Sequence, residues 1–309
     1  MIVTLTLNPA IDRTISVDRL AFEDRAYIKS SGETAGGRGI NASEVIHAFG
    51  GETLAVMTSG GDSGKRVEQL LTACGLRLAV APIANETRTN LTITDRHGLT
   101  VNLNEPGPEL TKAELARIEK TVREALGHAR WLMLCGSLPP GAPSSFYAKA
   151  IAMARQKKVK TLLHASGEAL QEGIEARPTV VTPNQQEAER LLGRTLLMRK
   201  QYLEAAEQVR KMGAESVVLT LGSRGAVGAF ADGVYEALPP RVDAVCPIGS
   251  GDALMAAYVW SMTRKANATD ALRWGVAAGT ASARLPGLSF ASLAQTQEMY
   301  KQVELRRAE

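Results

Sequence analysis

The sequence predicts an α/β domain in which a mostly parallel central sheet carries a small β-sheet lid. From about Thr111 onward, helix-like and strand-like segments alternate, which is the pattern of parallel strands joined by crossover helices. Two segments, at about 13–31 and 88–105, interrupt this alternation. Neither is large enough to form a core of its own. We therefore expect residues 1–309 to fold as a single domain with these two segments as its lid.

The elements follow in order along the chain. A strand-like run opens it at 2–7, and apolar runs predict further buried strands at 131–135, 160–163, 179–181 and 216–220. Polar or glycine-containing residues follow each run, and open α/β sheets bind ligands at the carboxyl ends of their strands. Alternating polar and apolar residues on both sides of the turn at 95–98 predict a hairpin. We expect the lid to exclude water when substrate binds.

Composition restricts the classes of function. Lys and Arg number 36 against 32 Asp and Glu, and this net charge of +4 is spread along the chain without a dense basic block. It favours anionic small molecules as partners and argues against nucleic acid. The three cysteines are far apart, which suggests reduced thiols, and no apolar span of membrane-crossing length is present. With no signal-peptide pattern at its start, the chain is expected to be cytoplasmic.

The segment 249–252, Gly-Ser-Gly-Asp, precedes a helix-compatible run. Small residues let the backbone N–H groups of Gly249, Ser250 and Gly251 turn toward one point, and a helix that starts there adds the positive end of its dipole. A phosphate fits such a site. Asp252 is well placed to take a proton from a hydroxyl that attacks the phosphate. The alternative is a strand-to-helix turn in which Asp252 only caps the helix.

Asn184 and Glu187 open another predicted helix, after Thr182 and Pro183. Their oxygens could help to hold a hydrated Mg²⁺ and nucleotide phosphates, since Mg²⁺ prefers oxygen ligands and keeps most of its waters. The same spacing is that of a capping box, which sequence logic alone favours. The two roles are compatible.

Two segments near the start of the chain are candidates for holding a sugar. Asp12 ends the turn-like run 8–12, and its carboxylate could accept hydrogen bonds from sugar hydroxyls, although Asn-Pro and Asp are also ordinary turn residues. The glycine-rich run 35–42 could bring backbone close to a substrate, with Asn41 offering an amide. Its alternative is a tight turn before a packed helix. The run 60–65 lacks the residues of a phosphate-binding P-loop and is rejected as one.

Taken in order, these motifs resemble those of the ribokinase-like sugar kinases, and within them the phosphofructokinase-B branch, which includes 1-phosphofructokinase and tagatose-6-phosphate kinase. The resemblance covers nearly the whole chain and rests on segments 6–12, 36–41, 88–90, 104–108, 136–139, 166–170, 184–187 and 249–252. It implies a three-layer ribokinase-like sandwich and ATP-dependent transfer of a phosphoryl group to a phosphorylated ketohexose. Fructose 1-phosphate, fructose 6-phosphate and tagatose 6-phosphate are the candidate acceptors.

The resemblance also implies roles for residues. Asp252 would be the base, and the amides of Gly249, Ser250 and Gly251 would stabilise charge on the transferring group. MgATP would be the donor. The sugar would be held by Asp12, Gly37, Arg38, Asn41 and Ser137, its phosphate by Arg25 and Arg88, the metal and phosphates by Asn184 and Glu187, and the nucleotide by Thr220 and Gly222.

This chain departs from the branch at three positions. His164 stands where Asp is usual, and Thr182 and Arg38 stand where Lys is common. The first two changes remove charged groups expected near the nucleotide phosphates or metal. Two alternatives therefore stay open, a kinase of an unphosphorylated sugar or nucleoside and a non-catalytic phosphosugar sensor. Exposed lid strands are natural pairing edges, which makes a homodimer through the lid a further expectation.

Overall fold

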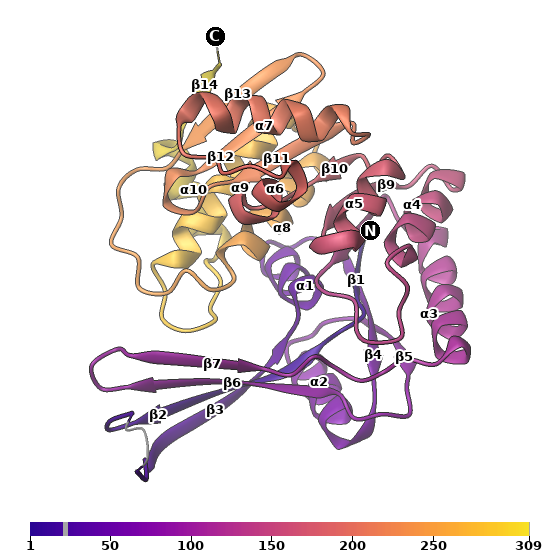
Figure 1. Cartoon of the computed structure of the whole chain (residues 1–309), viewed down its shortest axis with the longest axis vertical. Coiled ribbons are helices and arrows are strands. Elements are labelled where there is room, and N and C mark those ends of the chain that lie inside the picture. The colour runs from indigo at the N-terminus through magenta and orange to yellow at the C-terminus, as the bar shows by residue number, and fades with distance from the viewer. Residues whose placement is uncertain (21–23, 309) are drawn as a thin grey trace.

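The computed structural model describes residues 1–20 and 24–308 as a large sheet covered by helices on both faces and a smaller sheet that projects from one end (Figure 1). The large sheet has the order β14-β13-β12-β11-β10-β9-β8-β1-β4-β5. Neighbours from β5 to β11 pair in parallel, whereas β12, β13 and β14 extend the sheet antiparallel. Its strands are β1 (Ile2–Thr6), β4 (Thr53–Ser59), β5 (Leu78–Pro82), β8 (Trp131–Cys135), β9 (Lys160–His164), β10 (Val180–Val181), β11 (Ser216–Thr220), β12 (Ala226–Phe230), β13 (Gly233–Leu238) and β14 (Glu304–Arg307).

The parallel strands are mostly apolar because both faces of the sheet are buried. Along β8, Leu132 and Leu134 face one hydrophobic cluster while Trp131 and Met133 face the other. Each fully buried side chain of this size contributes about 1.5–3 kcal/mol. The first cluster packs under α3 (Lys112–Ala125), α4 (Phe146–Gln156), α5 (Gly167–Glu175), α6 (Gln185–Leu192) and α7 (Arg199–Lys211), and the second under α1 (Arg38–Ala48), α8 (Ser250–Thr263), α9 (Ala268–Ala283) and α10 (Leu293–Gln302). The result is three layers.

The smaller sheet, with strand order β3-β2-β6-β7, contains the two segments predicted to form the lid, and we call it the lid sheet (Figure 1). Its strands are β2 (Ala10–Val17), β3 (Ile28–Gly36), β6 (Arg88–Asp95) and β7 (Thr100–Asn104). The hairpin predicted over 88–105 is present, since β6 and β7 pair antiparallel across the expected turn. The first lid segment extends beyond the predicted 13–31. Strand β2 already starts at Ala10 and β3 continues to Gly36. Asp12 therefore lies on a lid strand and not in a turn after β1.

The remaining elements join these parts. Helix α2 (Gly61–Ala73) contacts both β4 and the lid strands β2 and β3. Its N-terminus is occupied by the Glu86 carboxylate, which accepts from the Ser63 N–H at 2.6 Å. This agrees with the rejection of 60–65 as a P-loop. Two short 3-10 helices, η1 (Leu126–His128) and η2 (Gly222–Arg224), complete the elements.

Candidate active site

Asp252 lies in the first turn of α8. The N-cap residue of this helix is Gly249, whose backbone is left-handed with φ 79°. Asp252 is 7% exposed, and its Oδ2 accepts a hydrogen bond from Asn41 Nδ2 at 2.6 Å. Burial raises the pKa of Asp252 to about 6, against the opposing effects of the Asn41 hydrogen bond and the Arg38 charge, while the Asp12 charge raises it further. The carboxyl group therefore faces polar neighbours and not the apolar core. A carboxylate with a pKa near neutral is suited to accept a proton.

The amides predicted to form an anion pocket are only partly free. The Ser250 N–H donates to the Pro247 carbonyl at 3.2 Å, which removes it from the predicted set. A Cβ atom added at Gly251 would meet no described atom within 4 Å. This space lies at the N-terminus of α8, where first-turn N–H groups lack intrahelical acceptors and the helix dipole is positive. An anionic group can be accommodated there without a change in the backbone.

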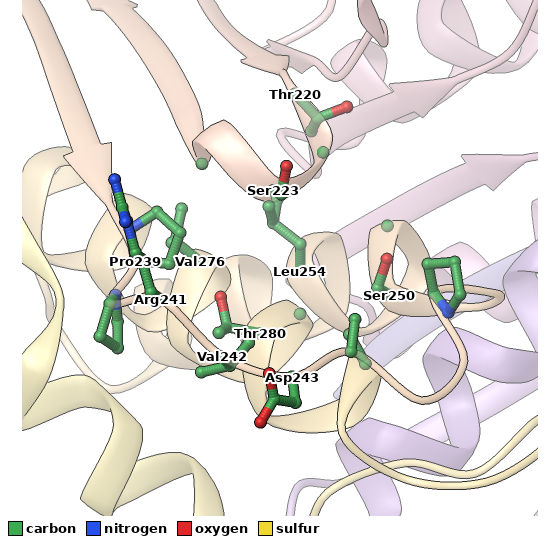
Figure 2. A pocket seen from close by; sticks show the side chains of 18 residues that line it. Thr220, Ser223, Pro239, Arg241, Val242, Asp243, Ser250, Leu254, Val276 and Thr280 are labelled. Atoms are coloured by element: carbon green, nitrogen blue, oxygen red, sulfur yellow. The ribbon is translucent and has the colours of Figure 1, made fainter.

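A cavity of about 650 Å³ opens beside this turn. Thr220 and Gly222, both predicted for nucleotide binding, lie on its wall together with Ser250 and Gly251. Figure 2 shows the residues of this cavity, which we call the α8 cavity, converging from the end of β11, the segment after β13 and helices α8 and α9. Its apolar lining includes Val242, Leu254 and Val276. Sequence reasoning missed segment 239–244, which carries no motif that would have singled it out.

Asn184 and Glu187 form a complete capping box at the start of α6. Asn184 Oδ1 accepts from the Glu187 N–H at 2.9 Å, and Glu187 Oε2 accepts from the Asn184 N–H at the same distance. The backbone of Asn184 also forms an isolated parallel β-bridge with Thr220, which lines the α8 cavity. Glu187 Oε1 is left facing Arg38 Nη1 at 3.6 Å. The predicted capping box is therefore present. The predicted role of Glu187 in holding a hydrated Mg²⁺ depends on its remaining oxygen, Oε1.

These two residues fit Mg²⁺ only through water. The cap occupies the amide oxygen of Asn184 and one carboxylate oxygen of Glu187. Within the described residues no cluster of three His, Cys, Asp or Glu side chains could ligate a metal directly. A hydrated Mg²⁺ held mostly by phosphate oxygens needs no more than one such carboxylate oxygen.

Where the lid meets the body, polar side chains gather around Asp12. Asn90 Nδ2 on β6 donates to Asp12 Oδ1 at 2.8 Å. Burial raises the pKa of Asp12, although the Asn90 hydrogen bond and the Arg88 charge oppose this effect. The side chain is half-buried and not exposed at a strand end, as the sequence suggested. A Cβ at Gly36 would overlap the Asp12 carboxylate, so this glycine gives the carboxylate its room.

Four buried polar atoms near Asp12 lack hydrogen-bond partners among the described residues. They are Asn8 Oδ1, Asn41 Oδ1, Arg88 Nε and Asn90 Oδ1. We call Asn8, Asp12, Asn41, Arg88 and Asn90 the polar cluster. Native proteins seldom leave such atoms unpaired, because each unmade hydrogen bond costs about 1–3 kcal/mol. These atoms are therefore candidates for contact with a bound ligand.

The predicted sugar-binding residues are placed unevenly around the polar cluster. Ser137 accepts from Asn8 Nδ2 at 3.2 Å and so belongs beside it. Two Arg88 nitrogens donate to backbone, to the Glu105 carbonyl at 2.8 Å and the Asn8 carbonyl at 3.1 Å. The backbone of Gly37 has φ 135°, and a Cβ there would come within 2.7 Å of Thr6 Cγ2. Packing against β1 is thus sufficient reason for this glycine.

Two predicted substrate-binding residues lie outside the polar cluster. Arg38 contacts His164 and Glu187 instead, and Arg25 is remote from the cluster. Arg25 is exposed and lies beyond Ile28, which pairs with Val17, whereas Asp12 pairs with Thr34 at the other end of the hairpin. At about 3.3 Å per residue, Asp12 and Val17 are roughly 16 Å apart along the strand. Arg25 is therefore too remote to act within its own polar cluster.

Comparison with known proteins decides the family. The family model described as "pfkB family carbohydrate kinase" matches residues 5–295. The chain belongs to this family. As a pfkB kinase it is a phosphotransferase that acts on a hydroxyl group, which argues against the non-catalytic sensor.

Two curated relatives differ in their named activities. The 1-phosphofructokinase of Vibrio cholerae is 28% identical to this pfkB kinase, over 98% of the chain and 96% of the relative. The ATP-dependent 6-phosphofructokinase isozyme 2 of Mycobacterium tuberculosis is 33% identical over 93% and 85%. The predicted fold is confirmed by phosphofructokinase-2 of Escherichia coli, solved in complex with potassium, which superposes with a TM-score of 0.93 at 29% identity over 97% and 98% of the two chains. None of this chain's described helices is both long enough and apolar enough to cross a bilayer.

Proposed function

We propose that this pfkB kinase transfers the γ-phosphoryl group of MgATP to a hydroxyl of a phosphorylated ketohexose, with Asp252 as general base. The observation that carries the proposal is the position of Asp252. Its carboxyl group bonds Asn41 of the polar cluster, while the two residues before it line the α8 cavity. A sugar in the cluster and a nucleotide in the cavity would meet at this carboxyl group.

The reaction follows from these positions. The acceptor hydroxyl gives its proton to Asp252 while the hydroxyl oxygen forms a bond to the γ-phosphorus of ATP. The bond between the γ-phosphorus and the β,γ-bridging oxygen breaks, and ADP leaves. The positive end of α8 would stabilise the negative charge of the group in transfer, and the open space at Gly251 would give that group room. Bound Mg²⁺, held through water by Glu187 and Asn184, would neutralise phosphate charge.

The polar cluster supports a polyhydroxylated acceptor. Asp12 would accept hydrogen bonds from sugar hydroxyls, and the unpaired oxygens of Asn8, Asn41 and Asn90 would do the same. Arg88 offers its free Nε to an anionic substituent. The lid strands that carry Asp12 and Arg88 would exclude water from the transfer.

We also propose that two copies pair through their lids. The described lid residues include exposed large apolar side chains, with Tyr27 75%, Ile28 58%, Leu99 54% and Leu103 52% exposed. Strands β3 and β7 leave unpaired edges. Because Arg25 lies too far from its own polar cluster, it could grip a substrate phosphate only in a neighbouring copy.

A coupled assay of ADP release tests the proposed function. We expect turnover with fructose 1-phosphate, fructose 6-phosphate or tagatose 6-phosphate, and the ratio of their kcat/KM values identifies the acceptor. Fructose and ribose are the matched controls without a phosphate. Folded protein that binds ATP but turns over none of the three phosphosugars would refute the proposal.

A second candidate, a kinase of an unphosphorylated sugar or nucleoside, is favoured by one observation. Two Arg88 nitrogens already bond backbone carbonyls, and Arg25 is remote, so a single chain offers little to a substrate phosphate. The variant Arg25→Ala separates the two candidates. It should raise KM for a phosphosugar at least tenfold while leaving KM for a free sugar unchanged, at a cost of about 1.4 kcal/mol per tenfold.

A further inference from the structure

Arg38 is anchored on one side by two buried groups. It is the first residue of α1, and its Nη1 lies 2.9 Å from Nε2 of His164 at the end of β9. The same nitrogen is 3.6 Å from Glu187 Oε1. The Arg38 side chain is 40% exposed, whereas His164 is 7% exposed. The guanidinium is thus held by His164 and Glu187, while part of the side chain remains exposed.

Hydrogen bonding determines which nitrogen of His164 carries the proton. Nδ1 lies 2.8 Å from the Thr182 carbonyl oxygen, which can only accept, so Nδ1 is the N–H donor. Nε2 then presents a lone pair and accepts from Arg38. Burial, together with the Arg38 charge, lowers the pKa of His164 to about 3, so the ring is neutral at physiological pH.

We propose that His164 is a positioning residue that holds the Arg38 guanidinium between the polar cluster and the α8 cavity, where its charge acts on the phosphoryl group in transfer. This inference rests on the proposed function. It assigns a purpose to His164, which stands where the related kinases usually have Asp. A carboxylate at 164 would pair with Arg38 and cancel its charge. A neutral imidazole fixes one N–H and leaves the charge in place.

The contacts of Arg38 support this location. Its charge acts on Asp252, and its nitrogen approaches Glu187 beside the capping box. Asp252 and Glu187 belong to the two sides between which the phosphoryl group would pass. Thr182, where a lysine is common in the branch, brings no second cation to this point. Arg38 is therefore a cation that links Asp252 electrostatically to Glu187.

Two amide variants of His164 provide a matched test. In His164→Gln the amide oxygen can reach the position of Nε2 and accept from Arg38. In His164→Asn the amide nitrogen can replace Nδ1 and bond Thr182, but nothing reaches Arg38. Because a misplaced transition-state group costs about ten- to a hundredfold, we expect the Asn variant to lose at least tenfold in kcat with KM values within about twofold. The Gln variant should keep kcat within about twofold.

A double-mutant cycle completes the experiment. Arg38→Met should lower kcat by itself, and His164→Asn should then cost no further activity. Equal losses in the Asn and Gln variants, or a full loss from His164→Asn on top of Arg38→Met, would show a purely structural role and overturn the inference. Thermal melting of each variant is recorded alongside.

A measurement on the unaltered protein keeps the test independent of folding and of activity. The ¹⁵N NMR spectrum of His164 should show a protonated Nδ1 and an unprotonated Nε2 that does not titrate between pH 5 and 8. A protonated Nε2 would overturn the inference even if neither variant folds. Absence of phosphosugar turnover in the wild-type protein would instead refute the proposed function, and the NMR result would still report on the pair.

Discussion

At the scale of single residues, the proposed chemistry depends on a buried carboxyl group whose pKa is raised. Asp252 is removed from water by the packing of α8, yet it keeps a hydrogen bond from Asn41. Its pKa of about 6 exceeds the ordinary value of 3.8, so folding favours the protonated form. Its contribution to stability is therefore present below pH 4 and is lost as the pH rises to about 6. A functional requirement here opposes stability.

Replacing this carboxyl group tests that balance. Asp252→Asn should lower kcat about 10²–10⁴-fold, because the proton acceptor is removed. At neutral pH the variant should be at least as stable as the wild type, because it no longer buries a charge. Steady-state kinetics and thermal melting measure the two effects. Asp62→Asn, in the exposed first turn of α2, is the control and should change neither. Activity retained in Asp252→Asn would exclude its role as base.

The pH dependence of kcat should report the same group. We expect kcat to fall below pH 6, since Asp252 must be ionised to accept a proton. In Asn41→Ala the lost hydrogen bond should raise the pKa of Asp252 and move this fall to higher pH. Titration of the substrate phosphate is identical for both proteins, so only a difference between them is informative. Coincident profiles would contradict the assignment.

At the scale of elements, two helix N-termini meet beside the α8 cavity and use their first turns differently. Helix α8 starts without a side-chain cap and leaves space in front of Gly251. Helix α6 is closed by its own capping box and presents the rest of Glu187 to Arg38. The first arrangement suits an anion, and the second suits a cation or a hydrated metal.

Gly251 tests the first arrangement. Gly251→Ala should stabilise α8 by about 0.5–1 kcal/mol, because alanine is the better helix former and the added methyl meets no protein atom. The same methyl would occupy the space proposed for the phosphoryl group, so kcat/KM should fall at least tenfold. Gly127→Ala, also without neighbours within 4 Å, is the control. Unchanged kinetics in Gly251→Ala would place the phosphate elsewhere.

The capping box provides a comparison between two helices. Asn184 and Asn267 each accept a hydrogen bond from the third residue of their helix, at 2.9 and 2.7 Å. Asn184→Ala and Asn267→Ala should each lower the free energy of unfolding by about 1 kcal/mol. Only Asn184→Ala should also raise KM for MgATP. Equal KM values for MgATP in the two variants would show that Asn184 acts only as a helix cap.

At the scale of the whole molecule, the small lid sheet projects from one end of the large sheet (Figure 1), and its strands β2 and β6 carry Asp12, Arg88 and Asn90 of the polar cluster. The lid sheet joins the body through β2 and β3, whose inner ends lie beside α1 and α2. Its outer end carries Arg25 and the exposed side chains of Tyr27 and Ile28. This geometry links the proposed phosphate specificity to assembly.

Ile28→Glu tests that link. A charge on the exposed lid should dissociate a lid-paired dimer without changing monomer stability, since Ile28 is 58% exposed. Light scattering coupled to size exclusion gives the mass, and KM for the phosphosugar should rise with dissociation. Leu197→Glu, 73% exposed outside the lid, is the control. A wild-type monomer at micromolar concentration would contradict lid pairing.

The sequence by itself determined the fold class, the buried strands β1, β8, β9, β10 and β11, and the hairpin of β6 and β7. Apolar runs and turn residues are local signals, so strands such as β8 and the start of α8 could be read directly. The parallel strands β4 and β5, the antiparallel strands β12 to β14 and the cavity wall at 239–244 were missed. For β14 the reason is that it pairs with β13, which lies far away in the sequence.

Only the tertiary structure decided which candidates meet. It set Asp252 against Asn41, 211 residues earlier in the chain, and gave Arg38 its contact with His164 across 126 residues. It committed the Ser250 amide to Pro247 and placed Arg25 far from Asp12. These contacts join segments that are distant in sequence, so no local pattern specifies them, whereas the capping box of Asn184 and Glu187 spans three residues and could be predicted from its spacing.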